Sequence, residues 1–140
     1  NFLIKILEVL GFKRVREVSP QTHDEMIAFV SQLCHILAVS LINSDEPDRE
    51  TAEFVGDTYR ELTRIAKINA PLWNELFLYN KQELLMAMEN FQDQFNLLKT
   101  AIEQEDQTTL TDLLVEATSR RKELEQADLK LQSATDNKNS

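Results

Sequence analysis

The chain has 140 residues, with 24 acidic and 15 basic side chains and a formal net charge of −9. This length is enough for one domain with its own core, and the acidic balance argues against nucleic acid as a partner, because phosphate binding needs a basic surface. The single cysteine excludes an intramolecular disulfide framework. Neither a membrane-spanning run nor a signal peptide is predicted. With only two glycines and three prolines, the composition favours long helices.

The first residues predict the end of an α/β domain followed by a link. Apolar residues recur at helical spacing from Phe2 to Leu10, and Gly11 suits the position that follows the last turn. Residues 12–18 fit a short edge strand or an extended link. Because the chain begins at Asn1 and not at a methionine, we expect it to be a piece of a longer protein.

Residues Ser19 to Asn43 predict a long helix, capped by Ser19 and with Pro20 at its first position. Its predicted apolar face comprises Ile27, Val30, Cys34, Leu37 and Leu41. A second line of small or polar residues comprises Asp24, Ala28, Ser31, His35 and Ala38. On periodicity alone this second line fits an ordinary solvated or close-packed face, and the functional alternative is a face that leaves room for a ligand. At about 100° per residue, His23 and His35 lie about 120° apart, so we do not expect them to share a ligand.

The next segment predicts a second helix from Asp48, as its cap, to Lys67. Gly56 lies inside it and should mark a break, a close backbone approach or a ligand. Arg60, Arg64 and Lys67 follow at i, i+4 and i+7 and would share one helix face. They fit either a solvated basic face or a site for a carboxylate, to which a guanidinium donates two parallel hydrogen bonds.

The C-terminal half predicts three more helices. A short one, capped by Asn69, runs from Pro71 to Asn80 and carries Trp73, which fits the core or a substrate surface. A second, capped by Asn80, runs from residue 81 to about 105, and the last begins at Thr108 or Thr109. Residues 132–140 predict a disordered tail. The expected fold is all-α, with about five main helices after a short α/β remnant. We expect three segments. Residues 1–18 are the end of another domain or a linker, residues 19–131 form the helical domain, and residues 132–140 are the tail.

Four motifs occur in order: His23-Asp24, then Ser-Gln-Leu-Cys-His at 31–35, Tyr-Arg-Glu-Leu-Thr-Arg-Ile-Ala at 59–66, and Pro-Leu-Trp at 71–73. Together they resemble the C-terminal helical domain of prephenate dehydrogenases, with motif detail from Ser19 to Leu85. The chain departs from the family pattern at Gln32 and Cys34, where a histidine and a proline are usual.

The resemblance implies a cytoplasmic, NAD- or NADP-dependent enzyme that converts prephenate to 4-hydroxyphenylpyruvate and CO2 in tyrosine biosynthesis. It implies that residues 1–18 are the end of a dinucleotide-binding domain or a linker, and that the helical domain forms a homodimer and closes the substrate site. Arg64 would hold a carboxylate of the dicarboxylate substrate, His35 and Trp73 would contact the substrate, and His23 would have an orienting or structural role. Ser31, in line with His35, joins the expected substrate contacts, with Asp24 and Arg60 in support.

The sequence also leaves alternatives. Since no Gly-x-Gly-x-x-Gly occurs and the family's catalytic histidine has no counterpart, we expect the chain alone to bind no dinucleotide or metal and to be inactive. The main alternative is a non-catalytic helical protein-interaction module, and an arogenate-specific dehydrogenase is another. A metal-dependent phosphohydrolase is a further alternative, but it would need more metal ligands than the His23-Asp24 pair supplies. An all-helical chorismate mutase is another, but the sequence around Gly56 and His35 does not resemble that family.

Overall fold

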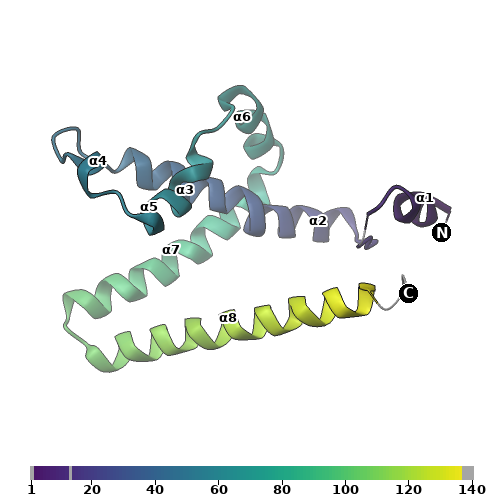
Figure 1. Ribbon diagram of the computed structural model, residues 1–140. Coiled ribbons are helices and arrows are strands. Elements are labelled where there is room, and N and C mark those ends of the chain that lie inside the picture. Colours follow the sequence, from purple (N-terminus) through teal and green to yellow (C-terminus); the bar gives the residue numbers. More distant parts are fainter. Residues whose placement is uncertain (1, 13, 137–140) are drawn as a thin grey trace. The chain divides into compact units, whose positions relative to one another are not determined.

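The computed structural model describes residues 2–12 and 14–136, which form helices joined by short turns (Figure 1). The predicted all-α class is confirmed. Within the described part of the chain no strand occurs, and residues 14–19 have no regular structure, so the extended link is found and the edge strand is not. The chain divides into two compact units, Val18–Asp93 and Asn1–Glu17 together with Gln94–Ser140.

One long helix dominates the unit Val18–Asp93. It consists of α2 (Pro20–Ile27), the π-helical η1 (Ala28–Gln32) and α3 (Leu33–Asn43), which follow without a break. The Oγ of Ser19 accepts a hydrogen bond of 3.1 Å from the N–H of Thr22, and Pro20 occupies the first turn, so the predicted N-terminus is confirmed. In η1 the N–H of Leu33 donates to the carbonyl of Ala28, five residues back. The sequence did not predict this wider turn.

The π-helical segment changes which residues of the long helix are buried. Ala28 is fully buried and forms a cluster with Leu33 and with Ala87 of α7 (Lys81–Glu103). The predicted apolar face is therefore wrong in part, since three of its members are exposed: Val30, Cys34 and Leu41. A stripe drawn at 3.6 residues per turn does not continue across a segment with i→i+5 bonding.

The long helix is also long and apolar enough to cross a membrane. It has 24 residues from Pro20 to Asn43, and its most apolar window has a mean hydropathy of 1.8. On these two criteria the expectation that no such run exists is wrong. Only 22% of this window is buried, although the helix supplies Ala28, Leu33 and Ala38 to the buried interior of Val18–Asp93.

Three short helices replace the single helix predicted from Asp48 to Lys67: α4 (Thr51–Phe54), α5 (Asp57–Thr63) and the 3-10 turn η2 (Arg64–Ala66). The chain is extended at Val55 and at Gly56, whose φ of −94° and ψ of −179° end α4 and begin α5. A Cβ at Gly56 would meet nothing within 4 Å. Gly56 thus marks a break and not a close backbone approach. Both α5 and η2 pack against α3.

The helix α6 (Ala70–Tyr79) completes this unit and meets α7 at Asn80. The predicted cap at Asn69 is confirmed, because its Oδ1 accepts a hydrogen bond of 3.3 Å from the N–H of Leu72. Asn80 also lies at the expected place, and its carbonyl accepts the first bond of α7 from Leu84. Its side chain, however, is directed to the long helix and not to the N-terminus of α7.

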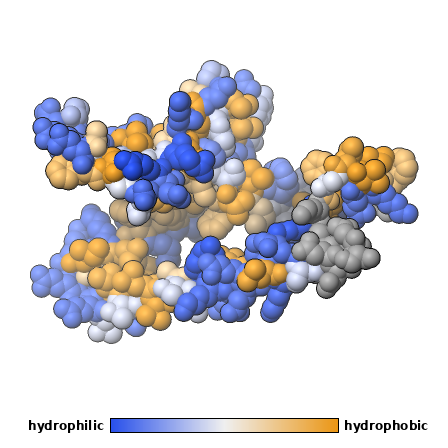
Figure 2. Space-filling view, viewed as in Figure 1, coloured by the Kyte–Doolittle hydropathy of each residue, from blue (hydrophilic) through white to orange (hydrophobic). Residues whose placement is uncertain are grey.

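The other unit contains α1 (Phe2–Val9), which ends at Gly11 with a φ of +92° and so confirms the predicted terminator. Its apolar side chains are largely exposed, with Phe2 at 81% and Val9 at 88%, and the space-filling view shows a broad orange area on α1 beside blue, hydrophilic side chains (Figure 2). Arg14 forms an ion pair of 3.0 Å with Asp128 of α8 (Gln107–Asp136), which ties the segment after α1 to that helix.

The start of α8 is set by Asp106. Its Oδ1 accepts a hydrogen bond of 3.0 Å from the N–H of Thr109, and its Oδ2 accepts one of 2.7 Å from the Thr109 hydroxyl. These bonds hold the pKa of Asp106 below its usual value. The helix starts slightly earlier than predicted and continues through Asp136, so the tail predicted from residue 132 is helical as far as Asp136. Residues 137–140 lie outside the described residues.

Candidate functional site

Two of the predicted substrate residues, His35 and Trp73, lie against each other. Their ring centroids are 3.7 Å apart, and the ring planes are inclined by 30°. His35 comes from the first turn of α3, and Trp73 from the first turn of α6. Trp73 also contacts Phe77, one turn further along α6, with centroids 5.4 Å apart. Both His35 and Trp73 are half-buried, so each ring is packed on one side and accessible in part.

The orientation of His35 is fixed by Ser31. The imidazole Nδ1 lies 2.9 Å from the backbone carbonyl oxygen of Ser31, and since a carbonyl can only accept, Nδ1 must carry the proton and donate. The neutral ring therefore has its lone pair on Nε2, and a protonated ring donates from Nε2 as well. Within the described part of the chain Nε2 has no hydrogen-bond partner. Ser31 thus contributes its carbonyl, and Nε2 is left for a ligand.

The predicted carboxylate ligand Arg64 lies on η2, which packs against α3, the helix that carries His35. Its side chain is exposed, and no described acidic residue pairs with it. An unpaired guanidinium in a chain of net charge −9 is available to an anion. Arg60 differs, because it pairs with Asp57 at 3.5 Å. The predicted face shared by Arg60, Arg64 and Lys67 is not formed as on one α-helix, since α5 ends at Thr63 and a 3-10 turn follows.

The His-Asp pair forms a contact of its own on α2. His23 Nδ1 donates to Asp24 Oδ1 at 2.9 Å, and the two side chains are 60% and 53% exposed. The sequence placed Asp24 nearly in line with His35, but the structure joins Asp24 to its neighbour His23. That alignment, like the angle predicted between the two histidines, assumed a regular α-helix throughout and does not apply across the π-helical η1.

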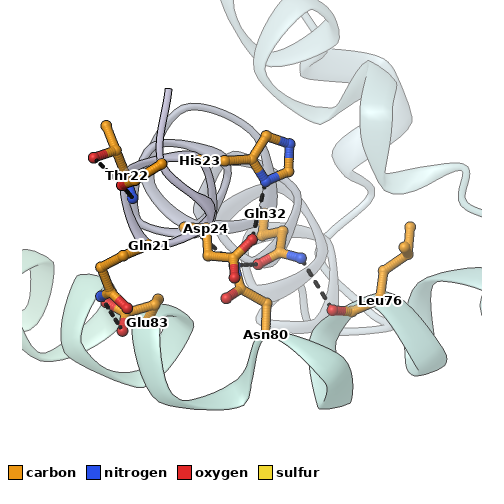
Figure 3. A network of polar contacts seen from close by, with 9 residues as sticks. Gln21, Thr22, His23, Asp24, Gln32, Leu76, Asn80 and Glu83 are labelled. Carbon is orange, nitrogen blue, oxygen red and sulfur yellow. Dashed lines mark hydrogen bonds and ion pairs between the residues drawn. The ribbon is translucent and has the colours of Figure 1, made fainter. Parts of the chain in front are cut away.

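The hydrogen bonds that Gln32 and Asn80 make between helices are the part of the site that sequence reasoning missed. Gln32 is 4% exposed, and its Nε2 donates to the carbonyl of Leu76 in α6 at 3.0 Å. Asn80 Nδ2 donates to Gln32 Oε1 at 3.0 Å and to the carbonyl of Asp24 at 2.9 Å (Figure 3). A glutamine inside an otherwise apolar helical stretch was the available signal, because buried polar groups need partners.

The chain shows few features of a cofactor or metal site. No group of three or more histidine, cysteine, aspartate or glutamate residues that could hold a metal ion occurs among the described residues. The two glycines, Gly11 and Gly56, stand alone after one helix and before another. They do not form the glycine-rich strand–turn–helix that holds a dinucleotide, so the residues present do not fit such a cofactor.

The fold and the site together define an all-α domain in which a histidine, a tryptophan and an unpaired arginine come from three packed or contacting helical segments. This chain belongs to the family described as "Prephenate dehydrogenase, dimerization domain", whose model matches residues 19–116. The resemblance stated from the motifs is thereby confirmed.

Relatives with curated functions agree with the family. The chain is 29% identical over 98 residues to a prephenate dehydrogenase of Bacillus subtilis, covering 67% of this chain and 26% of that protein. It is 28% identical over 98 residues to a cyclohexadienyl dehydrogenase of Zymomonas mobilis, covering 66% of this chain and 33% of that protein. The chain thus spans about a quarter to a third of the length of these relatives.

Solved structures show the same fold. The chain matches the prephenate dehydrogenase from A. aeolicus in complex with hydroxyphenyl propionate and NAD+, with a TM-score of 0.77, 31% identity and coverage of 88% of this chain and 44% of that one. The Synechocystis arogenate dehydrogenase matches with a TM-score of 0.77 and 23% identity, over 88% of this chain and 46% of that one. At this lower identity the second match concerns the fold alone.

Proposed function

We propose that this chain is the helical part of a prephenate dehydrogenase that converts prephenate to 4-hydroxyphenylpyruvate and CO2, and that it supplies substrate contacts and dimer contacts. The observation that carries the proposal is the stack of His35 on Trp73, with Nε2 of His35 left without a partner among the described residues. Membership of the dimerization-domain family supports it.

The proposed substrate contacts follow from the chemistry of prephenate, a dicarboxylate with an unsaturated six-membered ring. Arg64 binds one carboxylate through a charge-assisted hydrogen bond. His35 uses Nε2 toward a polar group of the substrate, while the Ser31 carbonyl fixes its ring. Trp73 offers apolar surface to the substrate ring. His23, Asp24 and Arg60 have supporting roles, since each is already engaged with a neighbour.

The proposed homodimer forms through helical surfaces. Along α7 and α8, large apolar side chains are exposed, including Phe95 at 56%, Ile102 at 61% and Leu114 at 57%. Exposed apolar surface of this kind is typical of faces that another chain covers. The name of the matched family is consistent with a second copy as that chain.

NAD or NADP would serve the whole enzyme as hydride acceptor. Because the residues present do not fit a dinucleotide, we infer that another part of the enzyme holds it and that this chain alone is inactive. We further propose a cytoplasmic location, as expected of a biosynthetic dehydrogenase. The competing function is a helical protein-interaction module, which the exposed apolar residues Phe29 and Val30 also suit.

A titration of the 140-residue chain tests the substrate proposal. Prephenate and arogenate are added separately while the emission of Trp73, the only tryptophan, and the NMR signals of His35 are followed. We expect saturable changes at both residues and no NAD-dependent turnover. If neither compound binds, the interaction module is favoured. If only arogenate binds, the arogenate-specific enzyme is favoured. Turnover by this chain alone would contradict the proposal that another part of the enzyme holds the dinucleotide.

A further inference from the structure

We propose that Gln32 and Asn80 are positioning residues that hold Trp73 against His35. We name this pair, with its bonds to the carbonyls of Asp24 and Leu76, the Gln32–Asn80 clamp. The inference deepens the proposed function, and its importance for substrate rests on that function. The contact between the two rings is a property of the fold and can be tested without any substrate.

The clamp joins the long helix to the end of α6. The Leu76 carbonyl accepts from the N–H of Asn80 at 3.3 Å and from Nε2 of Gln32 at 3.0 Å. The Leu76 carbonyl thus has its partner four residues further along the chain, and Gln32 adds a second hydrogen bond, to the other lone pair of this oxygen. Asn80 Nδ2 then connects Gln32 Oε1 with the carbonyl of Asp24 one helical segment earlier. The end of α6 is therefore held at two points on the long helix.

The register of the two helices links the clamp to the aromatic contact. Gln32 bonds to Leu76, and three residues later His35 stacks on Trp73, which lies three residues before Leu76. The two contacts therefore run in opposite directions along the long helix and α6, as they do between antiparallel helices. Residues three apart lie on the same face of a helix, so both contacts belong to the same pair of faces. The hydrogen bond and the ring contact are thus successive contacts of one interface, less than one helical turn apart.

The chemistry at position 32 is demanding because the side chain is buried. One amide must donate to the Leu76 carbonyl and accept from Asn80, and no buried side-chain polar atom of a described residue lacks a partner. An apolar side chain of similar length would leave the Leu76 carbonyl and the Asn80 amide with fewer bonds. A neutral imidazole has one donor and one acceptor and can replace the amide.

The test uses the whole 140-residue chain and the replacement Gln32→Met, which keeps length and volume but removes both bonds. Protons that lie over an indole ring are shielded, so the C–H protons of His35 should resonate upfield of those of His23, the only other histidine. We expect Gln32→Met to move the His35 signals toward those of His23 and to make Trp73 more accessible to acrylamide. Gln32→His should restore both properties.

Gln21→Met is the matched control, because Gln21 donates to Glu83 at 2.9 Å across the same unit but its bonds do not involve α6. It should leave the His35 shift unchanged. If Gln32→Met proves unfolded by circular dichroism, Asn80→Ala provides the second variant and should give a partial loss of the shift. An unchanged His35 shift in a folded Gln32→Met or Asn80→Ala chain would overturn the proposal. Prephenate binding is measured separately, so failure of the wild type to bind would count against the proposed function and not against the clamp.

Discussion

The imidazole of His35 and the indole of Trp73 lie 3.7 Å apart between ring centroids, although they come from different helices of the chain. His35 is held by the carbonyl of Ser31 on its own helix, and Trp73 lies one turn before the carbonyl that Gln32 binds. The ring of His35 is therefore fixed by a backbone carbonyl, and Trp73 lies on the helix whose end is bonded by Gln32, which leaves Nε2 of His35 for an incoming molecule.

Replacement of Arg64 by alanine should weaken prephenate binding without unfolding the chain. A hydrogen bond to a charged group contributes about 1.5–3 kcal/mol, which corresponds to a loss of affinity of about 10- to 100-fold. Calorimetric titration measures the affinity. Arg49→Ala is the control, because Arg49 is engaged with Asp45 and Glu46 on the turn before α4 and should not affect affinity. Equal affinity of the two variants would argue against Arg64 as a carboxylate ligand.

Replacement of Trp73 by alanine should reduce stability and prephenate binding more than replacement by phenylalanine. Trp73→Ala removes the stack on His35 and the contact with Phe77, so we expect both a lower melting temperature and a loss of binding. Aromatic pairs contribute about 0.5–1.5 kcal/mol beyond their area, and Trp73→Phe should keep most of this. Thermal unfolding with a prephenate titration separates the two effects. A Trp73→Phe chain as weak as Trp73→Ala would show that the indole N–H is needed.

The two glycines should respond oppositely to substitution. Gly56→Ser should change stability by less than about 0.5 kcal/mol, because its backbone is extended, an added Cβ meets nothing, and serine is a good helix cap. Gly11→Ala should destabilise by about 1–3 kcal/mol, since a φ of +92° strains any residue with a side chain. Urea unfolding measures both. A destabilising Gly56→Ser would indicate that Gly56 is packed more closely than the structure shows.

The cap of α8 by Asp106 should make the free energy of unfolding depend on pH in the acidic range. The hydrogen bonds from Thr109 lower the pKa of Asp106 from its usual 3.8, so the folded state favours the carboxylate. This contribution is fully present above pH 3.8 and is lost as the pH falls through the lower pKa of the folded state. Asp106→Asn should melt below the wild type at neutral pH, and the difference should shrink in acid. Thr109→Val should bring the pKa of Asp106, followed by NMR, back toward its usual value.

The proposed homodimer predicts a concentration-dependent mass. Analytical ultracentrifugation should give twice the chain mass of 16.2 kDa at high concentration and move toward the single chain on dilution. Ile102→Glu, at a residue that is 61% exposed on α7, should favour the monomer, because a charge buried in an apolar interface is costly. A single-chain mass at every concentration would contradict the dimer.

Local signals in the sequence predicted much of the fold. Ser19, Asn69 and Gly11 each act at the helix end where they were expected, because capping depends on one or two neighbouring residues. The helix predicted from Asp48 to Lys67 is broken because the backbone is extended at Val55 and Gly56. The spacing of apolar residues did not show this break, because helical spacing is found on both sides of it.

The motifs named the members of the candidate site, but they did not give its geometry. His35, Trp73 and Arg64 were named from the resemblance, and the first two are in contact. The Gln32–Asn80 clamp was not foreseen, because it joins residues from distant parts of the sequence, and periodicity describes each helix alone. The exposure of Val30 and Cys34 was missed for a related reason, since a stripe drawn on an ideal α-helix assumes regular bonding throughout.

The wide turn at Ala28–Gln32 takes up one residue more than a turn of regular α-helix. A relative with one residue fewer in this segment can therefore continue as an unbroken α-helix and keep the flanking residues in nearly the same register. A one-residue gap in an alignment at this place is thus compatible with a histidine in the position of His35 that still faces a tryptophan.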